Sequence, residues 1–215
     1  MANVPQQMNI FFLSRKTRRC ARWHCDKHVV KMILESAQML YTANHENGGA
    51  AAIESGAPVC ASTGRRGYKS HAKNHPCTKW VRESLAHYNW LLALAFDLVR
   101  EHMYRFSPKS IHACNAHLLW LKANPPPGLL EHRWLRDPPL AMPEECRVGD
   151  SVRSYIAYYN GAKRASGLLV YTKRHMPHVF IKSSEPRPSP PSLVLARPRQ
   201  SAPSRREKEV LGPSR

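Results

Sequence analysis

Five residues that can exchange protons or hold an anion recur along the segment CARWHCDKHVVKMILESAQMLY, residues 20–41. Spacings of four, three, four and three place them in one row if the segment is helical: His24, His28, Lys31, Glu35 and Gln38. Such a row can transfer protons near neutral pH, bind a metal ion or hold a phosphate. Asp26 and Lys27 lie beside it. A helix that buries two histidines at a contact and pairs Lys31 with Glu35 would show the same pattern, so a structural role stays open.

A second polar cluster comes directly before the most apolar helical segment. It contains His71, Asn74, His75 and Cys77, within HAKNHPCTKW. If the two segments form helices that pack side by side, the cluster can meet the first row, where a helix N-terminus and lysines would hold a phosphate. The catalytic residues that we predict come from both segments: His24, Asp26, Lys27, His28, Lys31, Glu35, Asn74 and His75.

A zinc site is an alternative interpretation of some of these residues. Cys25, His28, His75 and Cys77 offer four nitrogen and sulfur ligands, the number that a structural zinc ion takes. Their spacing is not that of a zinc finger, and the sequence contains neither HExxH nor GxxxxGK[ST]. We expect no cofactor, with zinc as the alternative.

The charge of the chain predicts a polyanionic partner. Lys and Arg number 33 against 15 Asp and Glu, a formal net charge of +18. Such an excess is typical of nucleic-acid binders. Aromatic residues among cations, as in YTKRHMPHVF and around Tyr155, Tyr158, Tyr159 and Lys163, suit stacking on bases. The residues that we expect to contact nucleic acid are Arg65, Arg66, Lys69, Lys73, Lys173, Arg174 and His175.

Apolar spacing predicts the helices that position these groups. The first should run from Thr17, as its N-cap, to Asn44 and bury Val30, Leu34, Ala37 and Tyr41. The second should span residues 78–106 with Thr78 as a cap candidate, followed by helices over 109–123 and 151–164, the last capped by Asp150 or Ser151. Residues 45–67 should form a loop. Residues 8–13 and 168–180 should be short strands or extended packed segments.

The predicted fold is therefore all-α, a single domain of four to five helices. Residues 1–182 would form a helical nucleic-acid-acting domain, and residues 183–215, which contain seven prolines, a disordered tail. The sequence has neither a run of about 18 apolar residues nor an export signal, so we expect a soluble, cytoplasmic protein that is monomeric and does not bind a membrane. Six scattered cysteines are then expected to be reduced thiols or metal ligands.

The motifs WHCDKHVVKMILESAQ and HAKNHPCTKWVRESLAHYNWL resemble a group of mostly uncharacterised phage and bacterial proteins, over about Met8 to Phe180. Through MNIFFL, the polar first helix and a long helix ending in REHMYRF, the chain distantly resembles phage-type pyrimidine-dimer DNA glycosylases, the endonuclease V enzymes of ultraviolet repair. That resemblance implies a compact helical fold in which an amine attacks the sugar, a Schiff base forms, a carboxylate assists, and strand cleavage follows.

The chain departs from this family where the amine is concerned. The family uses an N-terminal amine directly before the apolar start, whereas MANVPQQ precedes Met8 here. If translation begins at Met8, the N-terminal amine would lie closer to the expected place; otherwise Lys27 or Lys31 would serve as the nucleophile, with Asp26 or Glu35 as the acid. We predict a DNA glycosylase with AP-lyase activity; the alternatives are a zinc-stabilised nucleic-acid-binding module without catalysis and a metal-dependent nuclease.

Overall fold

The computed structural model describes residues 8–131 and 134–180, which form an all-α fold, as predicted. These residues contain seven α-helices and no β-strand, and Val59 and Arg66 form an isolated β-bridge. The helices are α1 (Thr17–Trp23), α2 (Asp26–Glu46), α3 (Ala50–Gly56), α4 (Pro76–Val81), α5 (Leu85–Phe106), α6 (Cys114–Ala123) and α7 (Ser151–Tyr158). The predicted tail, residues 183–215, lies outside the described residues.

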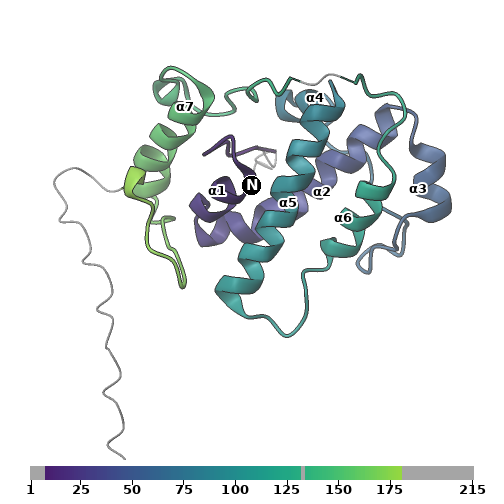
Figure 1. The fold of residues 1–215 in the computed structure, drawn as a ribbon, viewed down its shortest axis with the longest axis horizontal. Coiled ribbons are helices and arrows are strands. Elements are labelled where there is room, and N and C mark those ends of the chain that lie inside the picture. The colour runs from purple at the N-terminus through teal and green to yellow at the C-terminus, as the bar shows by residue number, and fades with distance from the viewer. Residues whose placement is uncertain (1–7, 132–133, 181–215) are drawn as a thin grey trace, which may run out of the picture. The chain divides into compact units, whose positions relative to one another are not determined.

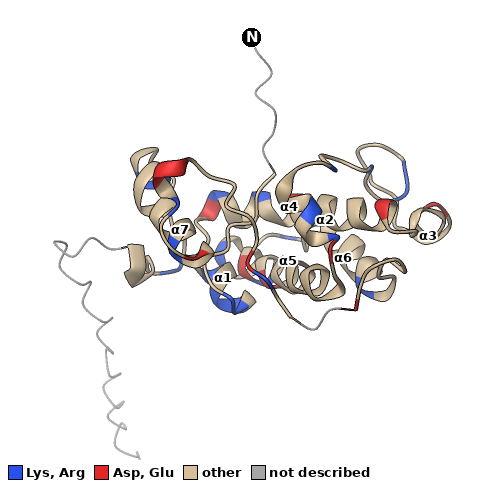
Figure 2. Ribbon diagram, turned by 90° about the horizontal axis from the view of Figure 1, so that it is seen from above, with Lys and Arg blue, Asp and Glu red and all other residues tan. Residues whose placement is uncertain are grey.

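The long helices α2 and α5 cross through the middle of the fold and form its core (Figure 1). In Figure 2, α5 and α6 lie in one layer, and α2 and α4 lie in the other. Val29, Ile33 and Leu40 of α2 and Leu91 and Leu98 of α5 are fully buried. Burial of such side chains contributes roughly 1.5–3 kcal/mol each, so this contact fixes the orientation of the helix that carries the polar row.

The buried face of α2 differs from the predicted one. Ala37 and Tyr41 are buried, as expected, but Val30 and Leu34 are 43% and 38% exposed. Because α5, α4 and α6 all contact α2, its buried stripe is wide and includes His28 and Glu35. The polar row therefore faces inward in part, and two apolar side chains face outward.

The predicted helix 17–44 is in fact two helices, because the chain is extended at His24 and Cys25. The break leaves backbone carbonyls without helical partners. The fully buried Arg105 guanidinium donates to Arg22 O at 3.0 Å and His24 O at 2.9 Å, and pairs with Asp26 at 2.9 Å and Glu101 at 2.8 Å. Arg105 therefore replaces the missing helical hydrogen bonds, from a position 81 residues after His24.

The predicted helix 78–106 is likewise broken, between α4 and α5. Ser84 is the N-cap of α5, and its hydroxyl accepts a hydrogen bond from His87 N at 3.3 Å. Thr78 lies inside α4, whose N-cap is His75, with Pro76 at the first helical position. A serine cap and a proline start are ordinary helix signals, but the uninterrupted apolar stripe concealed them.

Three other boundaries also differ from the predicted ones. Helix α3 lies within the predicted loop 45–67, and α6 begins at Cys114 rather than Lys109. Asp150 caps α7, as predicted, but the helix ends at Tyr158 and continues as one π-helical turn, Tyr159–Lys163. Residues 8–14 form a buried extended lead-in. No helix among the described residues is long and apolar enough to cross a membrane.

Replacement of Arg105 by alanine should strongly destabilise the fold. Asp26 and Glu101 would lose a buried cationic partner, a change that typically costs 3–5 kcal/mol. Urea unfolding followed by circular dichroism measures the loss. The control is Arg100→Ala, since Arg100 pairs with Asp97 at the surface and is 75% exposed; its cost should stay within about 1 kcal/mol. Equal losses would contradict the anchoring role of Arg105.

Candidate active site

Glu35 is a buried carboxylate with an amine beside it. Its Oε1 atom lies 2.7 Å from Lys31 Nζ, one helical turn earlier on α2. Its Oε2 atom accepts a hydrogen bond from the backbone N–H of Asn9 at 3.2 Å. The Glu35 side chain is 2% exposed and that of Lys31 is 42% exposed, so the pair connects the interior with the surface. A carboxylate placed in this way can take a proton from the amine.

Asn9 connects this carboxylate to the C-terminal part of the fold. Its Oδ1 atom accepts hydrogen bonds from Tyr155 Oη at 2.9 Å and from Ile10 N at 2.7 Å, and its Nδ2 atom donates to Ala141 O at 2.8 Å. The lead-in, α7 and the connection that contains Ala141 therefore meet at one asparagine beside Glu35. Sequence reasoning missed Asn9 and predicted base stacking for Tyr155, which is instead fully buried against Asn9, because these contacts span 132 residues or more.

A cavity of about 480 Å³ opens next to this junction. It is lined by Met8, His75, Pro76, Arg147 and Tyr158 together with residues 140–143. Met8 directly precedes Asn9, and His75 is close enough to Glu35 for the carboxylate charge to act on it. Burial lowers the pKa of His75, and the Glu35 charge opposes that shift. The two segments lie close together where His71 N donates to Thr42 Oγ1 at 3.0 Å and where the Glu35 charge acts on His75, whereas Asn74 is exposed.

His24 and His28 are buried and hold the lead-in in place. His28 stacks on Phe11 with ring centroids 4.1 Å apart, and its Nδ1 atom is 2.5 Å from Tyr159 Oη. His24 Nδ1 lies 2.7 Å from Cys20 O. Burial lowers the pKa of His24 to about 4 and that of His28 to about 2. Both rings are neutral at pH 7, and their contacts are those of packed histidines.

The other two predicted catalytic residues lie at the start of α2. Asp26 pairs with Arg105 and accepts hydrogen bonds from Thr172 N and Thr172 Oγ1 at 2.9 and 2.7 Å, so both of its oxygens are occupied. Lys27 is exposed. Of the two carboxylates that the sequence offered, Glu35 is thus the one that pairs with a lysine amine and whose charge acts on His75, a residue that lines the cavity.

The four zinc candidates do not form a metal site. Residues 8–131 and 134–180 contain no group of three or more His, Cys, Asp or Glu side chains that could hold a metal ion. Cys25 and Cys77 are buried free thiols. Burial raises the pKa of both thiols, that of Cys77 to about 12.

The residues predicted to contact nucleic acid differ in whether their side chains already bond to other groups of the protein. Arg65, Lys69 and His175 are exposed. Arg66 donates to Ala57 O at 2.8 Å, and Lys73 lies 3.9 Å from Glu46. Lys173 donates to Ser107 Oγ at 2.6 Å, and Arg174 forms a two-pronged pair with Glu101 at 2.7 and 2.9 Å. Lys173 and Arg174 therefore also fasten the C-terminal segment to α5.

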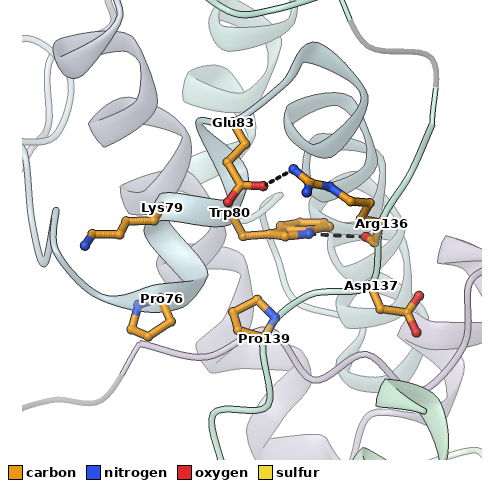
Figure 3. Close-up of a pocket in the computed structure, with 7 residues that line it drawn as sticks. All are labelled: Pro76, Lys79, Trp80, Glu83, Arg136, Asp137 and Pro139. Atoms are coloured by element: carbon orange, nitrogen blue, oxygen red, sulfur yellow. Dashed lines mark hydrogen bonds and ion pairs between the residues drawn. The ribbon is translucent and has the colours of Figure 1, made fainter.

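A second hollow, of about 370 Å³, lies beside the first and shares Pro76 with it (Figure 3). Trp80 crosses the hollow, and its indole N–H donates to Arg136 O at 3.2 Å. The Arg136 guanidinium pairs with Glu83 at 2.9 Å, while Lys79 extends away from them. Trp80, Glu83 and Arg136 bond to one another across this hollow. Their polar groups are therefore less available to a substrate than those of the cavity near Glu35.

Part of the chain matches a known protein family. A family model described as pyrimidine dimer DNA glycosylase matches residues 8–112. The match covers the lead-in and α1 to α5, and so includes Asn9, Lys31, Glu35 and His75. No curated protein and no solved structure matches the chain. The family match supports the distant resemblance to the phage-type enzymes and a function of the pyrimidine-dimer glycosylase type, with DNA as the substrate.

The buried histidines should make the fold acid-sensitive. Their pKa values are lower in the folded chain than the ordinary value of 6.5, so the unfolded chain binds more protons and stability falls as the pH drops below about 6.5. Each histidine contributes about 1.4 kcal/mol per pH unit in that window. His28→Gln should therefore reduce the stability lost between pH 7.5 and 4.5 by about 2–3 kcal/mol in urea unfolding. Exposed His71→Gln is the control, and an unchanged pH profile for His28→Gln would contradict the assignment.

Proposed function

We propose that the protein is a DNA glycosylase with AP-lyase activity in which Glu35 is the catalytic carboxylate. The observation that carries the proposal is a buried carboxylate held between the backbone of the lead-in and a lysine amine, with its charge acting on His75, which lines the cavity. Burying a charged group is costly unless it is paired. Glu35 is retained inside next to Lys31, in the part of the chain that matches the glycosylase family.

Lys31 is the amine that we assign as the nucleophile. In this chain the nitrogen of Asn9 is a peptide nitrogen, so the amine in contact with Glu35 is Lys31 Nζ. Proton transfer from Nζ to Glu35 gives a neutral amine, whose lone pair attacks C1′ of the damaged nucleotide. The N–C1′ bond forms, and the glycosidic bond breaks with its electron pair leaving on the base, which takes up a proton. Opening of the sugar ring then gives the Schiff base.

Strand cleavage follows from the Schiff base. The iminium acidifies C2′, loss of a C2′ proton to a base drives β-elimination, and the 3′ phosphate leaves with the electron pair of its C–O bond. Glu35 becomes able to act as that base once its own proton has passed on. Hydrolysis of the remaining imine returns Lys31 to its starting state, so each step uses groups of the Lys31–Glu35 pair and water.

The surroundings of the pair suit a distorted nucleotide. Tyr158, Met8 and residues 140–143 give the cavity apolar walls, and Arg147 supplies a cation. Lys163 Nζ lies 4.5 Å above the Tyr158 ring and adds a second cation nearby. Moving a base out of the duplex costs a few kcal/mol and is easiest at a lesion, where stacking is already weakened. Aromatic walls recover part of that cost by stacking.

Borohydride trapping in EDTA tests the nucleophile. A duplex with a thymine dimer or an abasic site should give a covalent band with the wild type, because borohydride reduces a Schiff base to a stable amine. Lys31→Ala should abolish the band, and Lys27→Ala, which removes an exposed lysine of the same helix, should retain it. A band that persists in Lys31→Ala would contradict the assignment of Lys31, and peptide mapping would locate the amine. Cutting that EDTA stops, with no band, would favour a metal-dependent nuclease.

Glu35→Gln should uncouple binding from chemistry. The amide keeps the shape of the side chain and can still accept from Asn9 N–H, but it cannot take the Lys31 proton. Single-turnover glycosylase rates should fall about 10²–10⁴-fold, with duplex affinity changed less than threefold. Thermal unfolding of the variant provides the folding control. A rate within tenfold of the wild type, in a folded protein, would remove Glu35 from the mechanism.

A further inference from the structure

We infer that the outer surface of α1 and α5 holds a second binding site for DNA phosphates, separate from the Glu35 cavity. It consists of a hollow of about 320 Å³ with arginines from three segments at its rim: Arg18, Arg22, Arg100 and Arg174. Its other lining residues are Asp97, Glu101 and Tyr104. That the anion belongs to DNA rests on the proposed function; that the hollow binds phosphate rests on its own residues.

The pairing within the hollow leaves two arginines available. Arg100 pairs with Asp97 at 2.6 Å, and Arg174 pairs with Glu101 at 2.7 Å. For Arg18 and Arg22 no ion pair is found among the described residues, and both are exposed. They lie one helical turn apart, on the same face of α1. Four arginines against two acids leave the hollow positive, with the unpaired charge on α1.

The frame of this hollow is rigid. Arg105 bonds to both the Arg22 carbonyl and Glu101, so α1 is fixed to α5 at the centre of the site. The Arg174 guanidinium stacks 3.9 Å above the Tyr104 ring, which is 48% exposed. Arginine forks held in place bind the oxygens of a phosphate in two-pronged fashion. Arg174 and Arg100 are held in this way by their acidic partners, and Arg18 and Arg22 are exposed on the adjoining face of α1.

The hollow and the catalytic cavity lie on different elements. Figure 2 shows the basic ribbon of α1 beside α5 in one layer, whereas Lys31, Glu35 and His75 belong to α2 and the segment before α4, in the other. The two cavities share no lining residue. The occupant is therefore either a bent arm of the same DNA or a second duplex, and the two sources share the same phosphate chemistry.

Paired DNA-binding measurements test this site. The test variant is Arg18→Gln/Arg22→Gln, and the matched control is Lys109→Gln/Lys122→Gln, which also removes two exposed positive charges but lies outside the hollow. On an undamaged long duplex the test variant should lose at least fivefold in affinity, and its log–log salt dependence should become shallower by roughly 2. The control should change less than twofold. Circular dichroism confirms folding.

A bridging measurement separates the two sources of phosphate. Protein is added to a bead-bound duplex and then to a labelled duplex. Retention of label by the wild type and the control, but not by the test variant, indicates a second duplex. An affinity loss for the long duplex without bridging by any of the proteins indicates a bent arm. If the test variant equals the control in affinity, salt dependence and bridging, the inference is overturned.

Borohydride trapping on damaged DNA distinguishes a failure of this inference from a failure of the proposed function. Trapping on a short damaged duplex should be unchanged in Arg18→Gln/Arg22→Gln, because neither residue contacts Glu35 or its cavity. If the wild type traps no DNA but the arginine variant still loses affinity, the glycosylase proposal fails and the phosphate site stands.

Discussion

The fold depends on a buried guanidinium at the point where the first helix is broken. Arg105 takes the carbonyls that α1 leaves free and pairs with Asp26, at the start of α2, and Glu101 on α5. Glu101 in turn holds Arg174. Burying a charge is costly unless it is paired. The contacts of Arg105 therefore fix where α2 begins and how α1 packs on α5, and through Glu101 they also fix where the C-terminal segment attaches to α5. Arg105 thereby positions α2, which carries Glu35, and α1 and α5, which line the arginine hollow.

The second constraint is that the buried Glu35 carboxylate needs bonding partners, and this need fixes the position of the lead-in, residues 8–14. A carboxylate that is 2% exposed needs hydrogen-bond donors, and Asn9 N–H and Lys31 supply them. Asn9 is held by Tyr155 and Ala141, and Phe11 two residues later by His28. The histidines at the start of the polar row therefore support the position of Asn9, while Lys31 and Glu35, at its centre, form the ion pair to which we assign the chemistry. The first turn of α2 thus holds the lead-in through His28, and the next turns carry the Lys31–Glu35 pair.

The sequence predicted what depends on local spacing, namely an all-α fold, the polar row, the apolar stripe of α5 and the meeting of Glu35 with the His75 segment. It did not predict the two helix breaks, since Arg105 acts from a distant position and Ser84 lies inside an unbroken stripe. The outward orientation of Val30 and Leu34 was missed because three helices contact α2 and set its rotation. Sequence analysis did not single out Arg18 and Arg22. Which cations stay free of ion pairs is decided in the folded chain, and the spacing of residues along the sequence does not show those pairs.

The matched region and the remainder of the chain contribute different parts of the candidate site. Residues 8–112, which match the glycosylase family, provide Asn9, Lys31, Glu35 and His75. Arg147, Tyr155, Tyr158 and residues 140–143, which hold Asn9 and line the cavity, come after that region. In the proposed reaction Lys31 and Glu35, from the first set, make and break bonds, and the second set provides most of the cavity wall against which the nucleotide would fit. Substitutions of the lining residues after residue 112 would therefore change the shape of the cavity while leaving the Lys31–Glu35 pair intact.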